Sequence, residues 1–89
     1  MTIERWQTFT KQQQLLMIWS EFKRAETWQF KDPELFAGAL MRAQELVDLT
    51  KLDSKWQTIH EMIIGVDFVM NQYRSHERTD SIGRLYRAL

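Results

Sequence analysis

The segment Asp32-Pro33-Glu34 constrains the fold most, because it has the features of a helix start. Asp is a favoured N-cap, Pro suits the first helical position, and an acid in the first turn interacts well with the helix dipole. Apolar residues then recur at the spacing of one helical face. They are Leu35, Phe36, Ala39, Leu40, Ala43, Leu46 and Val47. The pattern predicts an amphipathic helix over residues 33–49.

The rest of the chain shows the same helical spacing between short polar breaks. It predicts helices over residues 10–28 and 54–73, and a short last helix over 81–89. Thr10 and Gln13 resemble a capping box. Trp6 and Phe9 lie upstream, where they either extend the first helix or fold back over its end. The sequence therefore predicts one all-α domain, a small antiparallel helical bundle of three main helices plus a short C-terminal helix.

The remaining capping residues and a glycine give further expectations about helix ends and helix packing. Asp53 or Ser54 is expected to cap the helix over 54–73, and Asp80 can cap the last helix. Gly65 falls in the middle of a predicted helix, where glycine costs about 1 kcal/mol relative to alanine. Two interpretations stay open for Gly65: a close helix crossing or a tolerated glycine.

Composition excludes several classes of protein. The chain has 89 residues, no Cys, and 12 Lys plus Arg against 12 Asp plus Glu, so its formal net charge is zero. A chain of this kind lacks the basic excess of nucleic-acid binders, the thiols of disulfide frameworks and any apolar run of about 20 residues. Glu4 and Arg5 stand where a signal peptide needs apolar residues. We therefore expect a soluble cytoplasmic protein without a membrane segment.

A row of polar residues on the predicted third helix is the first candidate site. His60, Asp67, Asn71 and Arg74 project in nearby directions. Such a row could form a buried network, half of a metal site or an acid–base pair. One His offers too few ligands, however, and neither HExxH nor Glu-x-x-His occurs. We interpret the row as solvated or interface-lining, and expect no enzyme activity, metal or cofactor.

Arginines near the C-terminus are weak candidates for phosphate contacts. They are Arg78, Arg84 and Arg87. The simpler interpretation is that this tail complements the acidic third helix. A helix-turn-helix would need a basic recognition helix, and the helix over 54–73 is acidic and apolar. Nucleic-acid association is therefore the alternative hypothesis and not the leading one.

Aromatic residues cluster around the first predicted connection. Trp28, Phe30 and Phe36, together with Lys31, could form a small aromatic binding surface. Packing in the core or around the Asp32 cap is the interpretation we favour.

Several apolar residues do not lie on the predicted core stripes. They are Leu16, Met17, Met41, Ile64 and Phe68. Scattered exposed apolar residues are common, but a set of this size favours an interface, and Met occurs often on adaptable interfaces. We expect a protein–protein interaction or regulatory module whose partner is a second copy of itself, as a homodimer, or another protein.

Overall fold

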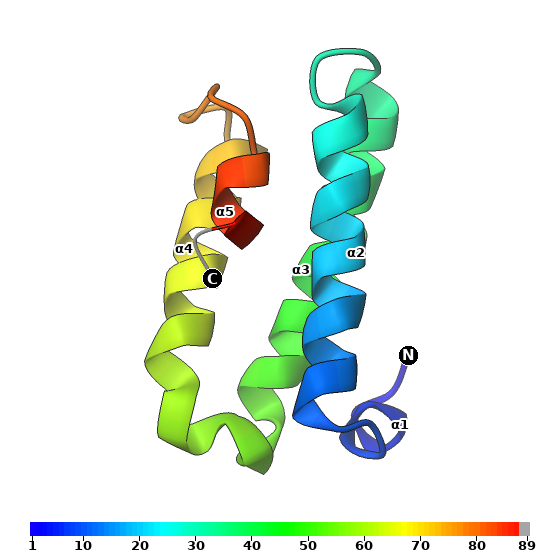
Figure 1. Cartoon of the computed structure of the whole chain (residues 1–89), viewed down its shortest axis with the longest axis vertical. Helices are drawn as coiled ribbons and strands as arrows, with labels where there is room; N and C mark the ends of the chain where they lie inside the picture. Colours follow the sequence, from blue (N-terminus) through cyan, green and yellow to red (C-terminus); the bar gives the residue numbers. More distant parts are fainter. Residues whose placement is uncertain (88–89) are drawn as a thin grey trace.

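Helices make up the whole ordered framework of the structure, a computed structural model that describes the backbone of residues 1–87 and the side chains of residues 1–85. In chain order they are α1 (Ile3–Gln7), α2 (Lys11–Trp28), α3 (Pro33–Leu52), η1 (Ser54–Ile59), α4 (His60–Arg74) and α5 (Gly83–Arg87). No strand occurs within residues 1–87. Figure 1 shows α2, α3 and α4 running up, down and up, with α5 returning beside α4. The predicted all-α fold class is confirmed.

Local hydrogen bonds explain where α2 and α3 begin. The Gln13 amide donates to Thr10 Oγ1 over 3.1 Å, and the Thr10 amide donates to Gln13 Oε1 over 2.9 Å, which completes a capping box. Asp32 Oδ1 accepts from the amides of Glu34 and Leu35 at 3.0 and 3.1 Å. Both starts lie where the sequence predicts them.

The end of α3 lies beyond the predicted boundary at residue 49. The helix continues to Leu52, and Thr50 within it is buried. The Thr50 hydroxyl donates to the Leu46 carbonyl over 2.8 Å and accepts from Trp6 Nε1 over 3.2 Å. Because both hydrogen-bonding roles of this hydroxyl are satisfied inside the fold, the polar residue does not break the helix.

The predicted helix over 54–73 is wrong in its first part. Residues Ser54–Ile59 form a 3₁₀ helix, and α4 begins only at His60. Asp53, rather than Ser54, caps the 3₁₀ helix by accepting from the Lys55 amide over 3.0 Å. Trp56 is fully buried and donates from Nε1 to Gln14 on α2 over 2.6 Å. The 3₁₀ helix thus places Trp56 in the core, where its indole bonds to Gln14, a residue 42 positions away in the chain.

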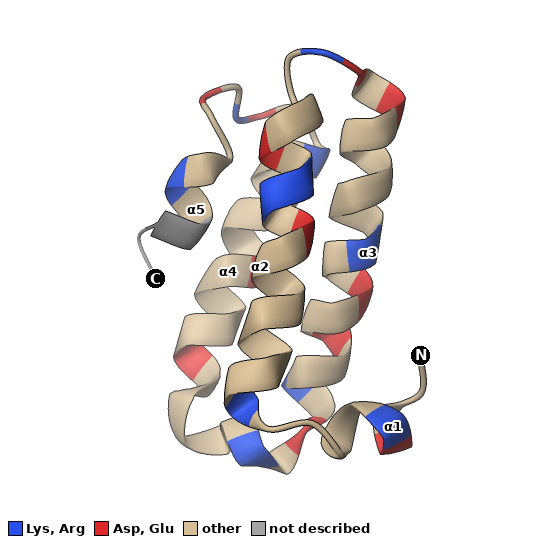
Figure 2. Cartoon of the chain, turned by 45° about the vertical axis from the view of Figure 1, so that its right-hand side comes forward, with Lys and Arg blue, Asp and Glu red and all other residues tan. Residues whose placement is uncertain are grey.

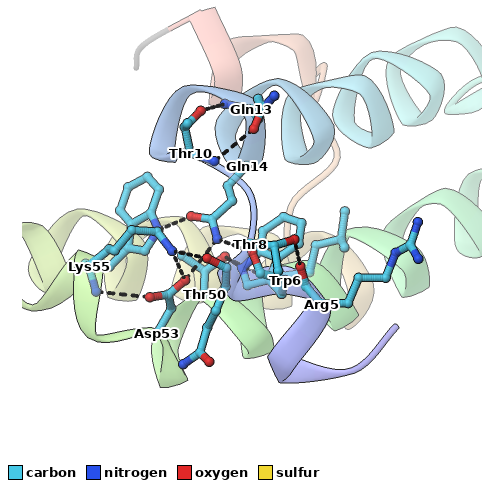
Figure 3. Close-up of polar contacts among 12 residues, drawn as sticks. Arg5, Trp6, Thr8, Thr10, Gln13, Gln14, Thr50, Asp53 and Lys55 are labelled. Carbon is cyan, nitrogen blue, oxygen red and sulfur yellow. Dashed lines mark hydrogen bonds and ion pairs between the residues drawn. The ribbon is translucent and has the colours of Figure 1, made fainter.

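A buried polar network joins α1, α2, α3 and η1 at the base of the bundle (Figure 3). Gln14 is its centre and is fully buried. Its Nε2 donates to the Trp6 carbonyl over 2.8 Å and to Asp53 Oδ2 over 2.9 Å, while its Oε1 accepts from Trp56. Trp6 itself is fully buried in α1, so the segment before α2 folds back and does not extend the helix.

The contacts of this network also lower the pKa of Asp53. Burial alone would raise the pKa of this carboxyl group. Hydrogen bonds from Gln14 and Lys55 and the charge of Lys55, whose Nζ lies 2.9 Å from Asp53 Oδ2, outweigh burial. The pKa of Asp53 therefore lies below its ordinary value.

The segment before α5 is fastened to the bundle by the side chain of Gln29. Its Nε2 donates to the Asp80 carbonyl over 2.7 Å, and the Ile82 amide donates to its Oε1 over 2.7 Å. Ile82 is fully buried, and α5 packs against α2. Ser81, rather than the expected Asp80, accepts from the first amide of α5, because the Gly83 amide donates to Ser81 Oγ. The Asp80 carboxylate accepts from the Tyr73 hydroxyl instead. α5 begins at Gly83 rather than at 81, and residues 88–89 of the predicted helix lie outside the described residues.

The core follows the predicted stripes with some differences. Ile18, Phe22 and Ala25 of α2 are buried, as are four members of the α3 stripe, Ala39, Leu40, Ala43 and Val47. Leu35, which belongs to the predicted stripe of residues 33–49, is exposed instead. A Cβ at Gly65 would meet no atom within 4 Å, so Gly65 does not mark a close helix crossing.

Candidate functional site

Most of the apolar residues outside the predicted stripes are exposed. The exposed fractions are 66% for Met41, 65% for Phe68, 53% for Leu16 and 45% for Ile64. Met17 differs, because it is partly buried against the core. Met17 is therefore only partly available to a partner, and its assignment to an interface stays a prediction.

Phe30 is exposed to 73%, so the interpretation that it packs into the core is wrong. Trp28 is also exposed, while Phe36 packs against the core as a partly buried residue. The connection between α2 and α3 thus presents an aromatic side chain to solvent. Phe30 is therefore part of an accessible aromatic surface and not of the core.

Two hollows on the surface of α3 and α4 adjoin at Arg74. The first is a cleft of about 450 Å³ between the α2–α3 connection, the start of α3 and the end of α4. Its lining comprises Gln29, Phe30, Pro33, Phe36, Ala37, Leu40, Met41, Tyr73, Arg74, His76, Arg78 and Thr79. The second is a shallow hollow along α4, lined by Ile64, Asp67, Phe68, Asn71, Gln72, Arg74, Ser75 and Glu77.

Arg74 lines both hollows, and each hollow also contains exposed apolar side chains. Phe30 and Met41 belong to the first hollow, and Ile64 and Phe68 belong to the second. We call these four residues together with Arg74 the α3–α4 face. Leu16 lines neither hollow.

The predicted polar row is only partly brought together. Asp67 accepts from Gln44 Nε2 over 2.8 Å and from Lys51 Nζ over 3.2 Å, both on α3. Asn71 donates to the Asp67 carbonyl, and Arg74 Nη1 donates to Gln44 Oε1 over 3.1 Å. The contacts of Asp67 with Gln44 and Lys51, and of Arg74 with Gln44, join α4 to α3. His60 is exposed, and no hydrogen bond within the described residues joins it to Asp67.

Gln44 is the member of this cluster that sequence reasoning missed. It lies one turn before Asp48 on α3 and donates to that carboxylate as well, over 2.8 Å. Lys51 completes the arrangement. Burial alone would lower the pKa of Lys51, but Asp67 and Asp48 outweigh burial through hydrogen bonds and charge, so this pKa lies above its ordinary value.

Arg74 of the α3–α4 face and Glu77 beside the face have no ion pair within the described side chains. Arg74 bonds to the neutral Gln44, and Glu77 lines the second hollow without a cationic partner. The face therefore has one uncompensated cation and a neighbouring uncompensated anion.

The arginines proposed as phosphate contacts are engaged elsewhere. Arg78 Nε lies 3.0 Å from Asp80 Oδ1, Arg84 Nη1 lies 3.8 Å from Asp80 Oδ2, and the side chain of Arg87 lies outside the described residues. Burial alone would raise the pKa of Asp80, but hydrogen bonds from Tyr73 and Arg78 and the charge of Arg78 lower it. In the view of Figure 2, basic segments are interspersed with acidic ones and form no continuous stripe.

Residues 1–87 hold no group of three or more His, Asp or Glu side chains placed to bind a metal ion. None of the described helices has both the length and the apolar character needed to cross a bilayer. Comparison with protein-family models, with curated proteins and with solved structures finds no match for this chain. The fold and the site define a small all-α bundle with an exposed apolar face.

Proposed function

We propose that this chain is a non-catalytic protein-interaction module that self-associates through the α3–α4 face. The observation that supports this function is the exposure of four large apolar side chains, Phe30, Met41, Ile64 and Phe68, in two hollows that share Arg74. Large exposed apolar side chains that gather in adjoining hollows are costly in water and typically mark an interface.

Charge favours a second copy of the chain as the partner. Arg74 and Glu77 lie at the same hollow, and neither has an ion pair within the described side chains. A two-fold dimer buries the same patch on both subunits, so Arg74 of each copy can lie opposite Glu77 of the other. A partner of a single strong charge would satisfy only one of the two residues.

Size and rigidity support the same proposal. A chain of 89 residues buries only about 60–65% of its unfolded surface, so a homotypic interface adds useful burial. The contacts of Asp67 with Gln44 and Lys51 hold α3 and α4 together beneath the face. A preorganised surface loses little conformational entropy on association.

Nucleic-acid association remains the alternative hypothesis and has weaker support. Asp80 already pairs with Arg78 over 3.0 Å and lies 3.8 Å from Arg84, so phosphate would have to compete with its carboxylate for both arginines. Titration with a labelled DNA duplex at low salt tests this alternative. Tight binding that weakens steeply with salt would favour it over self-association.

The test of self-association is the solution mass, measured by size exclusion with light scattering over a wide concentration range. We expect a concentration-dependent species of twice the 10.8 kDa of the single chain. The double variant Ile64→Gln, Phe68→Gln should stay helical and monomeric. Leu16→Gln is the matched control, because Leu16 is similarly exposed but lines neither hollow.

Three results would contradict the proposal. The wild-type chain could remain a monomer at every concentration, or the double variant could dimerise like the wild type. If the double variant unfolds while the control folds, Ile64 and Phe68 stabilise the single chain and do not form an interface.

A further inference from the structure

The geometry points to a ligand site in the first hollow: we propose that the cleft lined by Phe30, Met41 and Arg74 binds a small amphipathic carboxylate, in which an aliphatic or aryl-alkyl group ends in one carboxyl group. We call this hollow the carboxylate cleft. The carboxylate cleft shares Phe30, Met41 and Arg74 with the α3–α4 face, so a bound ligand would compete with self-association, whereas Ile64 and Phe68 belong to the face alone.

The volume and the apolar wall suit a small organic ligand. The carboxylate cleft measures about 450 Å³, within the range of about 300–1,000 Å³ that is usual for such sites. Its apolar lining includes Phe30, Pro33, Phe36, Leu40 and Met41. Leu40 is buried in the core and Phe36 packs against it, while Phe30 and Met41 are exposed.

The polar part of the lining favours a negatively charged ligand. Arg74, His76 and Arg78 line the carboxylate cleft, and its lining contains no Asp or Glu. Arg78 is committed to Asp80 and also lies over the Tyr73 ring, 5.6 Å from its centre. Arg74 is therefore the cation available to a ligand.

Arg74 has the donors that a carboxylate requires. A guanidinium carries five N–H donors in a planar fork that matches both oxygens of a carboxylate. In the described chain, one of these donors bonds to the Oε1 of Gln44. That bond holds the guanidinium at the boundary of the carboxylate cleft and leaves the other donors for a ligand.

The backbone after α4 closes this end of the cleft. His76 has a positive φ of 63°, a left-handed conformation that is uncommon outside glycine. The Glu77 amide donates to the Gln72 carbonyl over 3.0 Å, as in the turns that end many helices. The turn reverses the chain, so that Arg78 and Thr79 line the same cleft as the end of α4.

Titration of the ¹⁵N-labelled chain with octanoate, below its micelle concentration, tests the proposal by two-dimensional NMR. We expect saturable shifts of the amides around Phe30, Met41 and Arg74. Octanol and octylammonium serve as neutral and cationic probes of the same chain length, and both should bind at least about tenfold more weakly because they lack the charge-assisted bonds to Arg74.

Variants separate the role of the charge from that of the apolar wall. Arg74→Gln should weaken octanoate binding about tenfold or more and leave octanol binding unchanged, whereas Arg5→Gln on α1 is the matched control and should change neither. Phe30→Ala should weaken all three probes. The variant Ile64→Gln, Phe68→Gln keeps the whole lining of the cleft and removes two residues of the proposed dimer contact, so it should bind octanoate at least as tightly as the wild type. This variant makes the test independent of self-association.

The proposal is overturned if octanoate causes no saturable shifts in the wild-type chain. It is equally overturned if octanol or octylammonium binds as tightly as octanoate, or if Arg74→Gln retains wild-type affinity for octanoate while keeping its fold.

Discussion

Replacing Gln14 by leucine tests whether the buried network at the base of the bundle holds the fold together. Leucine fills a similar volume but can neither donate nor accept a hydrogen bond. The change removes the donor to the Trp6 carbonyl and the acceptor of Trp56 Nε1, at 2.8 and 2.6 Å. Asp53 loses one donor but keeps Lys55.

The expected loss of stability follows from the group left without a partner. The Trp6 carbonyl still accepts from the Phe9 amide over 3.2 Å, whereas the indole N–H of the fully buried Trp56 loses its acceptor. A buried, unsatisfied group costs about 1–3 kcal/mol, so the variant should lose about 1–3 kcal/mol of unfolding free energy. A chain of 89 residues has a total of about 4–13 kcal/mol, so the loss is a substantial part of its stability.

Urea denaturation followed by far-UV circular dichroism measures this loss. Gln12→Leu is the matched control, because Gln12 is exposed on the same helix and should change stability by less than about 0.5 kcal/mol. Adding Trp56→Phe to Gln14→Leu removes the orphaned indole N–H and should be less costly than the two single effects combined. If Gln14→Leu costs under about 1 kcal/mol, the hydrogen bonds of Gln14 do not stabilise the fold as proposed.

Three further predictions concern α4, the acid limit of stability and α5. Gly65→Ala should stabilise the chain by up to about 1 kcal/mol in thermal unfolding, because a Cβ there meets no atom within 4 Å; destabilisation would reveal a contact at this position. The lowered pKa of Asp53 contributes stability that is present above its ordinary pKa of 3.8 and is lost as the pH falls through the folded pKa. Asp53→Asn should therefore flatten the fall of unfolding free energy between about pH 5 and pH 2, and an unchanged slope would contradict the shift. Gln29→Leu should accelerate hydrogen exchange of the Ile82 amide at least about tenfold and leave α4 protected, because the amide loses its acceptor; equal protection in the variant would show that Gln29 does not fasten α5.

The limits of sequence reasoning are clearest at the two sites. The exposure of Met41, Ile64 and Phe68 follows from their positions off the helical stripes. Their placement with Phe30 in two hollows that share Arg74 depends on how α3 packs against α4 and on the turn after α4. The helical periodicity of the sequence predicts neither the packing nor the turn. The same limit explains Met17, because a helix pattern does not show which further segments cover a second face.

The sequence by itself determined the helical class and the starts of α2 and α3. Those starts depend on Thr10 with Gln13 and on Asp32 with the next three residues, so every bonding partner is local. Only the tertiary structure decided that α3 continues through Thr50 and that the segment around Trp56 is a 3₁₀ helix. The Thr50 hydroxyl bonds to Trp6 and the Trp56 indole bonds to Gln14, which lie 44 and 42 residues away in the chain. Because buried polar groups need hydrogen-bond partners, the backbone at each position takes the conformation that brings the side chain to its partner.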